Sequence, residues 1–217
     1  MTSAVAAVAA SSDRKTAPIQ ARIDREIEDL LATLPDPEQM SAAERRGIVA
    51  RYSAVLEGNF IYWMTGAYIA AGSEAARAKI MDNLREEVRD CHPGMLRRFA
   101  IAADAVPDAD DAQAVYQNLM NVRLFIGRLS PVPIVVTMAF FEGFIQRFMP
   151  YLADLASRQG SSDMEYTDVH GVCDVTHTQE LFNALESEMA LSRPVPDGEM
   201  FEGVELLRTL IRNIVSG

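Results

Sequence analysis

The chain has 217 residues, of which 49% are hydrophobic, and its formal net charge is −11. This length favours one domain with a sizeable core. Nucleic-acid phosphates require a basic surface, so the negative charge argues against DNA or RNA as a partner. No apolar run reaches the roughly 18 residues of a membrane span, and two cysteines cannot form a disulfide framework. We therefore expect a cytoplasmic protein that does not enter a membrane.

The chain begins with an Ala- and Ser-rich segment, residues 1–17, that we expect to form a disordered tail. This segment lacks the basic region with which a signal peptide starts. From residue 18 to residue 217 we expect a single domain. Its apolar residues recur at the spacing of helices, and strand-like alternation is almost absent. The first predicted helix covers about residues 18–34 and ends before Pro35.

The next helices are predicted from their caps. Ser41 and Glu44 form a capping box, which begins a long helix to about Ala71. Gly72 and Ser73 begin a second long helix, and Pro107 with its acidic neighbours marks a loop. A further helix then extends to about residue 129.

Two core helices and a terminal one follow. Ser130 and Pro131 begin a helix that Gly160 ends, because proline is favoured at the first helical position. Ser162 and Glu165 form a second capping box, which begins another helix. Prolines between residues 192 and 198 end it, and a last amphipathic helix begins near residue 199. The sequence predicts an all-α bundle of six to eight helices.

Two histidines and an aspartate in the helix after Ser162 form the pattern H-x3-D-x2-H. On a regular helix Asp174 lies about 40° from His170, and His177 lies about 20° away on the other side. The two histidines are about 10 Å apart along the axis, so one metal cannot bind both. Two metals about 3.5–4 Å apart could be reached. Imidazoles beside a carboxylate suit divalent first-row metals, iron included.

Glu142 interrupts an apolar, aromatic-rich run in the preceding helix. A carboxylate buried in such surroundings must be paired or bound to a metal. We favour a metal ligand, because other potential ligands are present on neighbouring helices. The alternative is an ion pair with Arg147 or with another arginine.

The second long helix offers Glu86, Glu87 and His92. Glu87 and His92 are separated by about 140° on a regular helix, and Glu86 and His92 by about 120°. Pro93 disfavours helical geometry at His92, so we predict an irregularity at His92–Pro93 that turns the imidazole toward the acid. The alternative is a helix-terminal histidine beside surface acids.

These residues resemble the haem-oxygenase-like diiron oxidases and oxygenases, which have a bundle of about seven helices. In that family a Glu and a His come from one core helix, a Glu from a second, and H-x3-D-x2-H from a third. The resemblance spans about residues 41–190 and implies the metal ligands Glu87, His92, Glu142, His170, Asp174 and His177. The stretch between the first Glu and the His is shorter here than usual, so Glu86 remains an alternative to Glu87. Some relatives add a carboxylate from the first long helix, for which Glu57 is the possible residue.

The resemblance also implies chemistry. It implies two iron ions, O2 as a co-substrate and a small-molecule substrate. Our leading prediction is N-oxygenation of an amine- or amino-acid-like metabolite in a biosynthetic pathway. The alternative is oxidative C–C cleavage or desaturation of an amino acid or fatty acid. We expect a homodimer and an external reductant, and a substrate pocket formed by Phe60, Trp63, Phe141, Tyr166 and Arg123.

Two other classes of protein share this architecture. A metal-free hydrolase resembling the thiaminase-II-like proteins would use Cys91 or Cys173 as its nucleophile, but the acidic surroundings disfavour a thiolate. A non-catalytic helical binding protein is the third possibility. The ferritin-like diiron proteins are disfavoured, because their paired E-x-x-H motifs are not found in this sequence.

Overall fold

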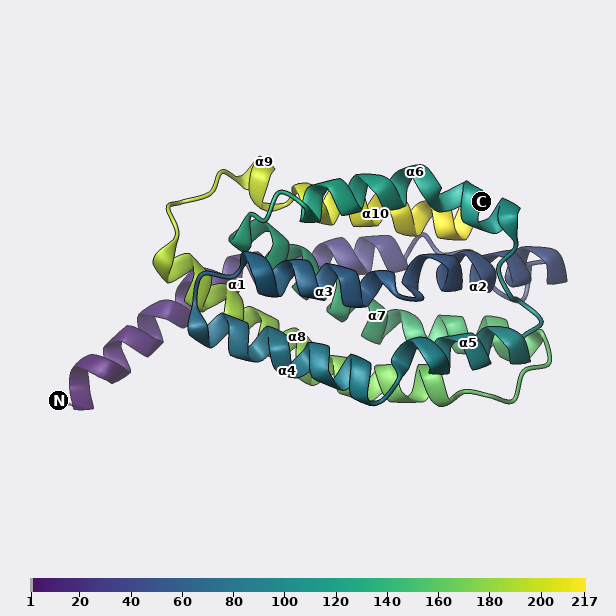
Figure 1. Ribbon diagram of the computed structural model, residues 1–217, viewed down its shortest axis with the longest axis horizontal. Helices are drawn as coiled ribbons and strands as arrows, with labels where there is room; N and C mark the ends of the chain where they lie inside the picture. The colour runs from purple at the N-terminus through teal and green to yellow at the C-terminus, as the bar shows by residue number, and fades with distance from the viewer. Residues whose placement is uncertain (1) are drawn as a thin grey trace.

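A computed structural model describes the backbone of residues 2–217 and the side chains of residues 16–217. All regular secondary structure in this part of the chain is helical, which confirms the predicted all-α bundle (Figure 1). The side chains of residues 1–15 lie outside the described part of the chain. The disordered tail expected at residues 1–17 therefore stays a prediction. The helices are α1 (Thr2–Leu31), α2 (Ala42–Leu56), α3 (Asn59–Ala70), α4 (Glu74–Arg89), α5 (His92–Ala102), α6 (Ala109–Ile126), α7 (Pro131–Arg158), α8 (Glu165–Leu191), α9 (Asp197–Met200) and α10 (Glu202–Ser216).

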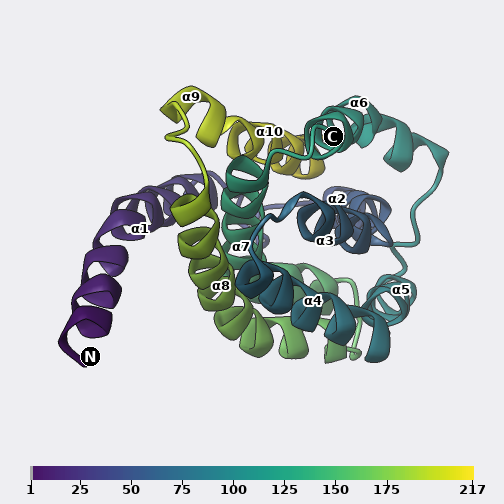
Figure 2. The same ribbon diagram turned by 60° about the vertical axis from the view of Figure 1, so that its left-hand side comes forward.

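Helix α7 forms the centre of the bundle. It packs most extensively against α8, and α4 and α5 lie on one side of it while α6 and α10 lie on the other (Figures 1 and 2). By length and composition α7 could cross a membrane, but 89% of its most apolar window is buried inside the bundle. Burial on all sides is what an all-round apolar helix requires in a protein core.

The first predicted long helix is divided in two. The capping box at its start is confirmed, because the Ser41 N–H donates to Glu44 Oε2 (2.7 Å) and the Glu44 N–H donates to Ser41 Oγ (3.3 Å). The expectation of one helix to Ala71 is wrong, since α2 ends at Leu56 and α3 begins at Asn59. Gly58 between them has φ 88°, a left-handed conformation that glycine adopts without a Cβ clash.

The second predicted long helix is divided as well, between α4 and α5. The predicted irregularity is confirmed, but it lies at Asp90 and Cys91, just before His92. Cys91 has φ 58° and ψ 45°, and its carbonyl accepts the N–H groups of Gly94 (2.8 Å) and Met95 (3.1 Å). Pro93 therefore does not distort His92. It occupies the first turn of α5, where the missing N–H leaves no intrahelical bond unmade.

Helix α8 does not begin with the predicted second capping box. Its N-cap is Met164 without a side-chain cap, and the Glu165 N–H donates instead to Asp163 Oδ1 (3.3 Å). Ser162 is exposed to solvent. The serine and glutamate had the right spacing, but the helix begins two residues later than the pattern requires.

The far end of α8 is anchored by a buried carboxylate. Glu188 is 1% exposed, and its two oxygens accept the N–H groups of Gly72 (3.1 Å) and Ser73 (2.6 Å). Hydrogen bonds to backbone donors compensate a buried carboxylate for its lost water. Glu188 thereby fixes α8 against the turn from which α4 begins.

The last helix, α10, packs against α6 and α7 at very close range. A Cβ atom placed on Gly203 would lie 2.1 Å from Thr137 Oγ1 and 2.4 Å from Phe125 Cε1. Only glycine leaves room for that approach. Its packing closes the core on the side opposite to α4 and α5.

Candidate metal centre

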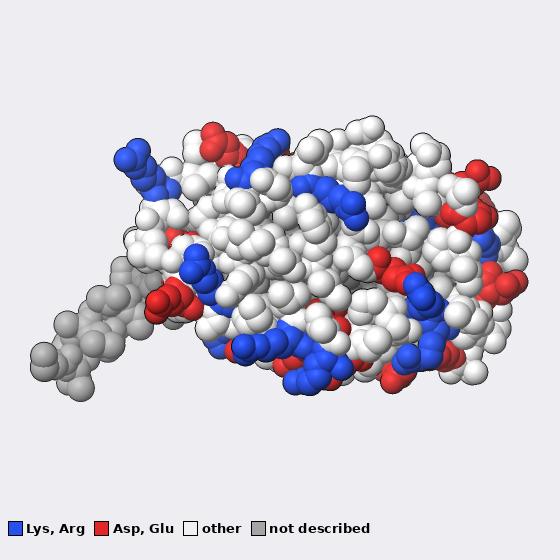
Figure 3. Space-filling view, viewed as in Figure 1, with Lys and Arg blue, Asp and Glu red and all other residues white. Residues whose placement is uncertain are grey.

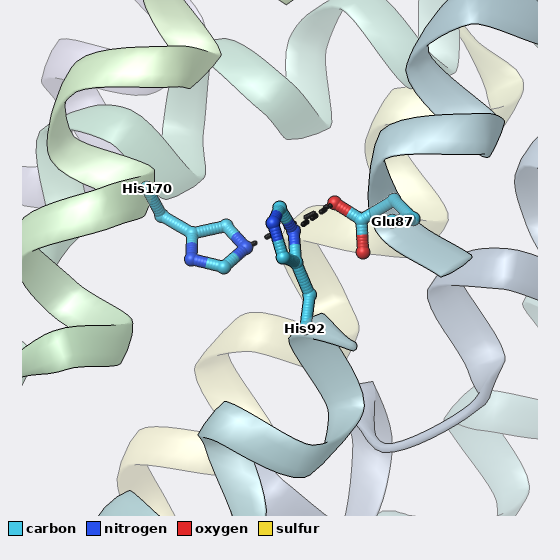
Figure 4. Close-up of side chains that lie close together, drawn as sticks. All are labelled: Glu87, His92 and His170. Carbon is cyan, nitrogen blue, oxygen red and sulfur yellow. Dashed lines mark hydrogen bonds and ion pairs between the residues drawn. The ribbon is translucent and has the colours of Figure 1, made fainter. Parts of the chain in front are cut away.

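Four helices direct acids and imidazoles into one interior region. Glu87 comes from α4, His92 from the start of α5, Glu142 from the middle of α7, and three residues come from α8. Figure 4 shows the side chains of Glu87, His92 and His170 pointing toward one another. The six ligands that the resemblance implies are all 5% exposed or less: Glu87, His92, Glu142, His170, Asp174 and His177.

The first group of potential ligands consists of Glu87, His92 and His170, with ligand atoms that all lie within 4.8 Å of one another. His92 Nδ1 is 2.7 Å from Glu87 Oε1, and His170 Nε2 is 3.9 Å from the same oxygen. The backbone carbonyl of Tyr166 lies 2.8 Å from His170 Nδ1. Because a carbonyl only accepts, Nδ1 carries the proton and the Nε2 lone pair faces the group. His170 is thus prepared to bind a metal through Nε2.

The second group contains Asp174, His177 and Glu142. His177 Nδ1 lies 3.6 Å from Asp174 Oδ1 and 3.9 Å from Glu142 Oε1. Two neighbours hold these acids: the Asn83 amide donates to Glu142 Oε1 (2.6 Å), and the Cys173 thiol donates to Asp174 Oδ1 (3.1 Å). The three residues of the second group therefore share one space, and each acid has one oxygen already engaged.

The second group contains two buried polar atoms without a hydrogen-bond partner. Asp174 Oδ2 and His177 Nδ1 are buried, and within the described part of the chain neither has a hydrogen-bond partner. Leaving such groups buried and unsatisfied costs about 1–3 kcal/mol each, and more where the group is charged. A divalent cation between them would satisfy both atoms at once.

The electrostatics point the same way. Burial, and then the charge of Asp174, raises the pKa of Glu142 well above its usual range. Burial alone would lower the pKa of His177, but the close approach of its Nδ1 to the Asp174 carboxylate and the charge of Glu142 outweigh it and raise that pKa to about 10. Both shifts reflect excess negative charge in a dry site. A bound cation would neutralise it, and the imidazole and carboxylate donors fit iron.

The structure shows where three alternatives considered from the sequence lie. Glu142 does not pair with Arg147, which forms ion pairs with Asp24 and Glu28. Glu57 is not directed into the centre, because its carboxylate pairs with Arg97 and lines a separate hollow on the surface. The adjacent acids of α4 separate as well. Glu87 joins the first group, whereas Glu86 contacts the outer side of His177.

A small cavity of about 20 Å³ adjoins the ligands, and it has room for about one water molecule. Of the predicted pocket residues, Phe60 and Tyr166 line it. Trp63 and Phe141 pack behind Phe60. The ring centroids of Phe141 and Phe60 are 5.8 Å apart, and those of Phe141 and Trp63 are 5.2 Å apart. Arg123 does not reach the cavity, which corrects that prediction: its guanidinium donates to Asn59 Oδ1 (2.9 and 2.6 Å). The apolar and aromatic walls are Leu56, Phe60, Ile61, Pro93, Leu96, Ile145 and Tyr166.

Two functional neighbours escaped the sequence reasoning. Asn83 is 2% exposed and lies four residues before Glu87, on the same face of α4. That spacing could have identified it. The Tyr52 hydroxyl lies 2.8 Å from the Tyr166 hydroxyl, between helices distant in the sequence. In the sequence Tyr52 is one of several apolar positions of its helix, so it carried no separate signal.

Neither cysteine is prepared to act as a nucleophile. Cys91 is exposed in the turn between α4 and α5. Burial and the charge of Asp174 raise the pKa of the Cys173 thiol far above its usual range. A neutral thiol is a poor nucleophile. These surroundings count against the hydrolase alternative.

A comparison with protein families places this geometry. The sequence model of a family described as iron-containing redox enzymes matches residues 49–210, which is most of the chain and includes all six buried ligands. No curated protein and no solved structure gave a significant match. The matched segment covers α3 to α9 and about half of each of α2 and α10, so the family match and the bundle describe the same part of the molecule. The chain belongs to this family of iron-containing redox enzymes and has the haem-oxygenase-like bundle of helices that the resemblance implied.

Proposed function

We propose that the protein is an O2-dependent non-haem oxygenase or oxidase that holds two iron ions. One observation carries the proposal: the first group lines a single cavity together with Asp174 and Glu142 of the second group. Glu142 lines the cavity together with the first group and is also 3.9 Å from His177 in the second. A carboxylate in that position can serve both metals of a dinuclear site.

Each ligand then has a role. Glu87, His92 and His170 would hold one iron, Asp174 and His177 the other, and Glu142 would contact both. Two bound ferrous ions would supply electrons for the reduction of O2. The chain itself orients the ligands: the Tyr166 carbonyl fixes the His170 ring, and the Asn83 amide fixes one oxygen of Glu142. The apolar walls exclude water from the reacting groups.

The substrate predicted from the sequence is a small amine- or amino-acid-like metabolite, oxidised at nitrogen. The apolar lining of the cavity supports a second candidate, oxidative C–C cleavage or desaturation of an amino acid or fatty acid. Apart from the ligands, its described walls are apolar or aromatic, which suits an aliphatic part of a substrate. Measuring oxygen consumption with short amines, amino acids and fatty acids, together with the masses of the products, distinguishes the two candidate reactions. Added oxygen on nitrogen supports the first, and loss of carbon or of two hydrogens supports the second.

We further propose that the enzyme works in the cytoplasm as a homodimer, with an external reductant and without nucleic acid or membrane. The net charge of −11 supports the absence of a nucleic-acid partner. On the face seen in Figure 3 the basic side chains are scattered, and several lie beside acidic ones. Among the described ion pairs are those of Arg85 with Asp82 and of Arg97 with Glu57. A phosphate backbone would require a continuous basic surface instead.

The proposal is tested by loading the protein with Fe(II) without oxygen and measuring iron per chain. We expect two irons, and a transient visible absorption when O2 is admitted. His170→Ala and His177→Ala should each lose at least one iron. Asp168→Ala is the matched control, because Asp168 is exposed on the same helix and should keep both. Full iron content in both histidine variants would contradict the proposed ligands.

A further inference from the structure

His177 is held between acids on its two sides. Its Nε2 atom lies 2.9 Å from Glu86 Oε2, while Nδ1 faces Asp174 and Glu142 at 3.6 and 3.9 Å. The two nitrogens of an imidazole ring point in diverging directions. Glu86 therefore lies on the side of the ring away from the other two acids.

Glu86 and Glu87 are neighbours in α4 with different surroundings. Consecutive residues of a helix project about 100° apart, so the two carboxylates cannot reach the same point. The side chain of Glu87 is 5% exposed within the first group, whereas that of Glu86 is 42% exposed beyond the ring of His177. The nearby arginines of α4 are engaged elsewhere, because Arg85 pairs with Asp82 and Arg89 pairs with Asp90.

We propose that Glu86 is a positioning residue that makes His177 bind the second iron through Nδ1. Its carboxylate accepts the Nε2–H of His177 and so fixes the tautomer whose free lone pair is on Nδ1. That atom is the buried nitrogen without a partner, directed at Asp174 and Glu142. A ligating histidine commonly donates its other N–H to such a partner, which orients the ring and strengthens the ligand.

The two histidines of α8 would then bind through opposite nitrogens. In His170 the proton is on Nδ1, held by the Tyr166 carbonyl within the same helix, and Nε2 is free. In metal-bound His177 the remaining proton would be on Nε2, held by Glu86 of α4, and Nδ1 would be the ligand atom. The inference rests on the proposed function, because it assumes a metal in the second group.

Zinc is the probe, because it is diamagnetic and accepts the same donors. In zinc-loaded, 15N-labelled protein we expect the His177 signals of a metal-bound Nδ1 and a protonated Nε2. In Glu86→Ala the affinity of the second zinc should fall about 10- to 100-fold while the first is unchanged. Glu86→Gln keeps an acceptor oxygen and should restore most of the affinity. Asp82→Asn, on exposed α4 surface, is the matched control and should change neither zinc.

The outcomes separate the inference from the proposed function. Binding of His177 through Nε2, or unchanged zinc affinity in Glu86→Ala, would overturn the inference alone. Complete loss of one zinc from both Glu86→Ala and Glu86→Gln would make Glu86 a ligand and would also overturn it. Failure of the wild-type protein to bind any zinc or iron would overturn the proposed function and the inference together. Circular dichroism of each variant distinguishes these results from loss of folding.

Discussion

The proton on His177 gives the metal-free protein an unusual dependence on pH. The pKa of this residue rises from 6.5 to about 10 on folding, so the folded state holds the proton more tightly than the unfolded state. The stabilisation is fully present below pH 6.5 and is lost as the pH rises toward 10. With a chelator present, the free energy of unfolding should therefore fall as the pH rises across this range.

Urea unfolding at several pH values measures this effect. His177→Gln should weaken the dependence without abolishing it, because the raised pKa of Glu142 remains and acts in the same direction. In the presence of Fe(II) the trend should reverse, since the metal competes with the proton and binds more tightly as the pH rises. An equal slope in wild type and His177→Gln would show that another group is responsible.

At the level of single residues, much of the centre could be predicted from the sequence. Glu142 was recognisable because a carboxylate in an aromatic-rich run has few roles besides binding a partner in the core. The residues of H-x3-D-x2-H share a helix, so their common face follows from helical geometry alone. The role of Glu86 could not be predicted in this way, because it depends on where α4 lies beside α8. That packing is fixed by contacts between segments about 90 residues apart.

At the scale of elements, the turn between α4 and α5 is the feature that completes the first group. It holds Cys91 in a left-handed conformation that is unfavourable for a residue with a side chain. Because Cys91 is exposed, Cys91→Gly should remove the strain without loss of packing. We expect the protein to gain up to about 1 kcal/mol of stability and to keep its iron content.

Thermal unfolding and metal analysis of Cys91→Gly test this prediction. Arg212→Gly is the control, because Arg212 is exposed within a regular helix. There glycine should destabilise by about 1 kcal/mol. A destabilised Cys91→Gly variant would mean that the side chain contributes contacts that outweigh its strain.

Local patterns predicted some helix ends and missed others for a physical reason. The capping box of Ser41 and Glu44 is satisfied within four residues, so the sequence contains all that it needs. Ser162 and Glu165 have the same spacing, but the backbone there turns into α8 two residues later. The break at Gly58 left only a weak signal, because a single glycine is also tolerated inside helices.

At the scale of the molecule, the close packing of α10 should control stability without touching the centre. Gly203→Ala places a methyl group against Thr137 and Phe125, where no space exists. Overpacking of this kind costs about 1–3 kcal/mol. Iron per folded chain should be unchanged, because α10 supplies no ligand.

Chemical denaturation with metal analysis checks this separation. Gly198→Ala is the matched control, since nothing lies within 4 Å of a Cβ placed there. It should leave stability unchanged or raise it by up to about 1 kcal/mol. Loss of iron from folded Gly203→Ala would instead show that the packing of α10 is transmitted through α7 to Glu142.

Because of the turn between α4 and α5, the spacing of Glu87 and His92 in the sequence need not match the period of a helix. Glu87 and His92 are five positions apart in the sequence, which is not a whole number of helical turns. Because two helices meet between them, a residue inserted or deleted in the connection could be absorbed there while both side chains kept their places. In α8 the same insertion between His170 and His177 would rotate one of them by about 100° away from the other. In related chains the number of residues between the counterparts of Glu87 and His92 can therefore vary. A sequence search that fixes this number would overlook such chains. The spacing of His170 and His177 within α8, by contrast, must be preserved.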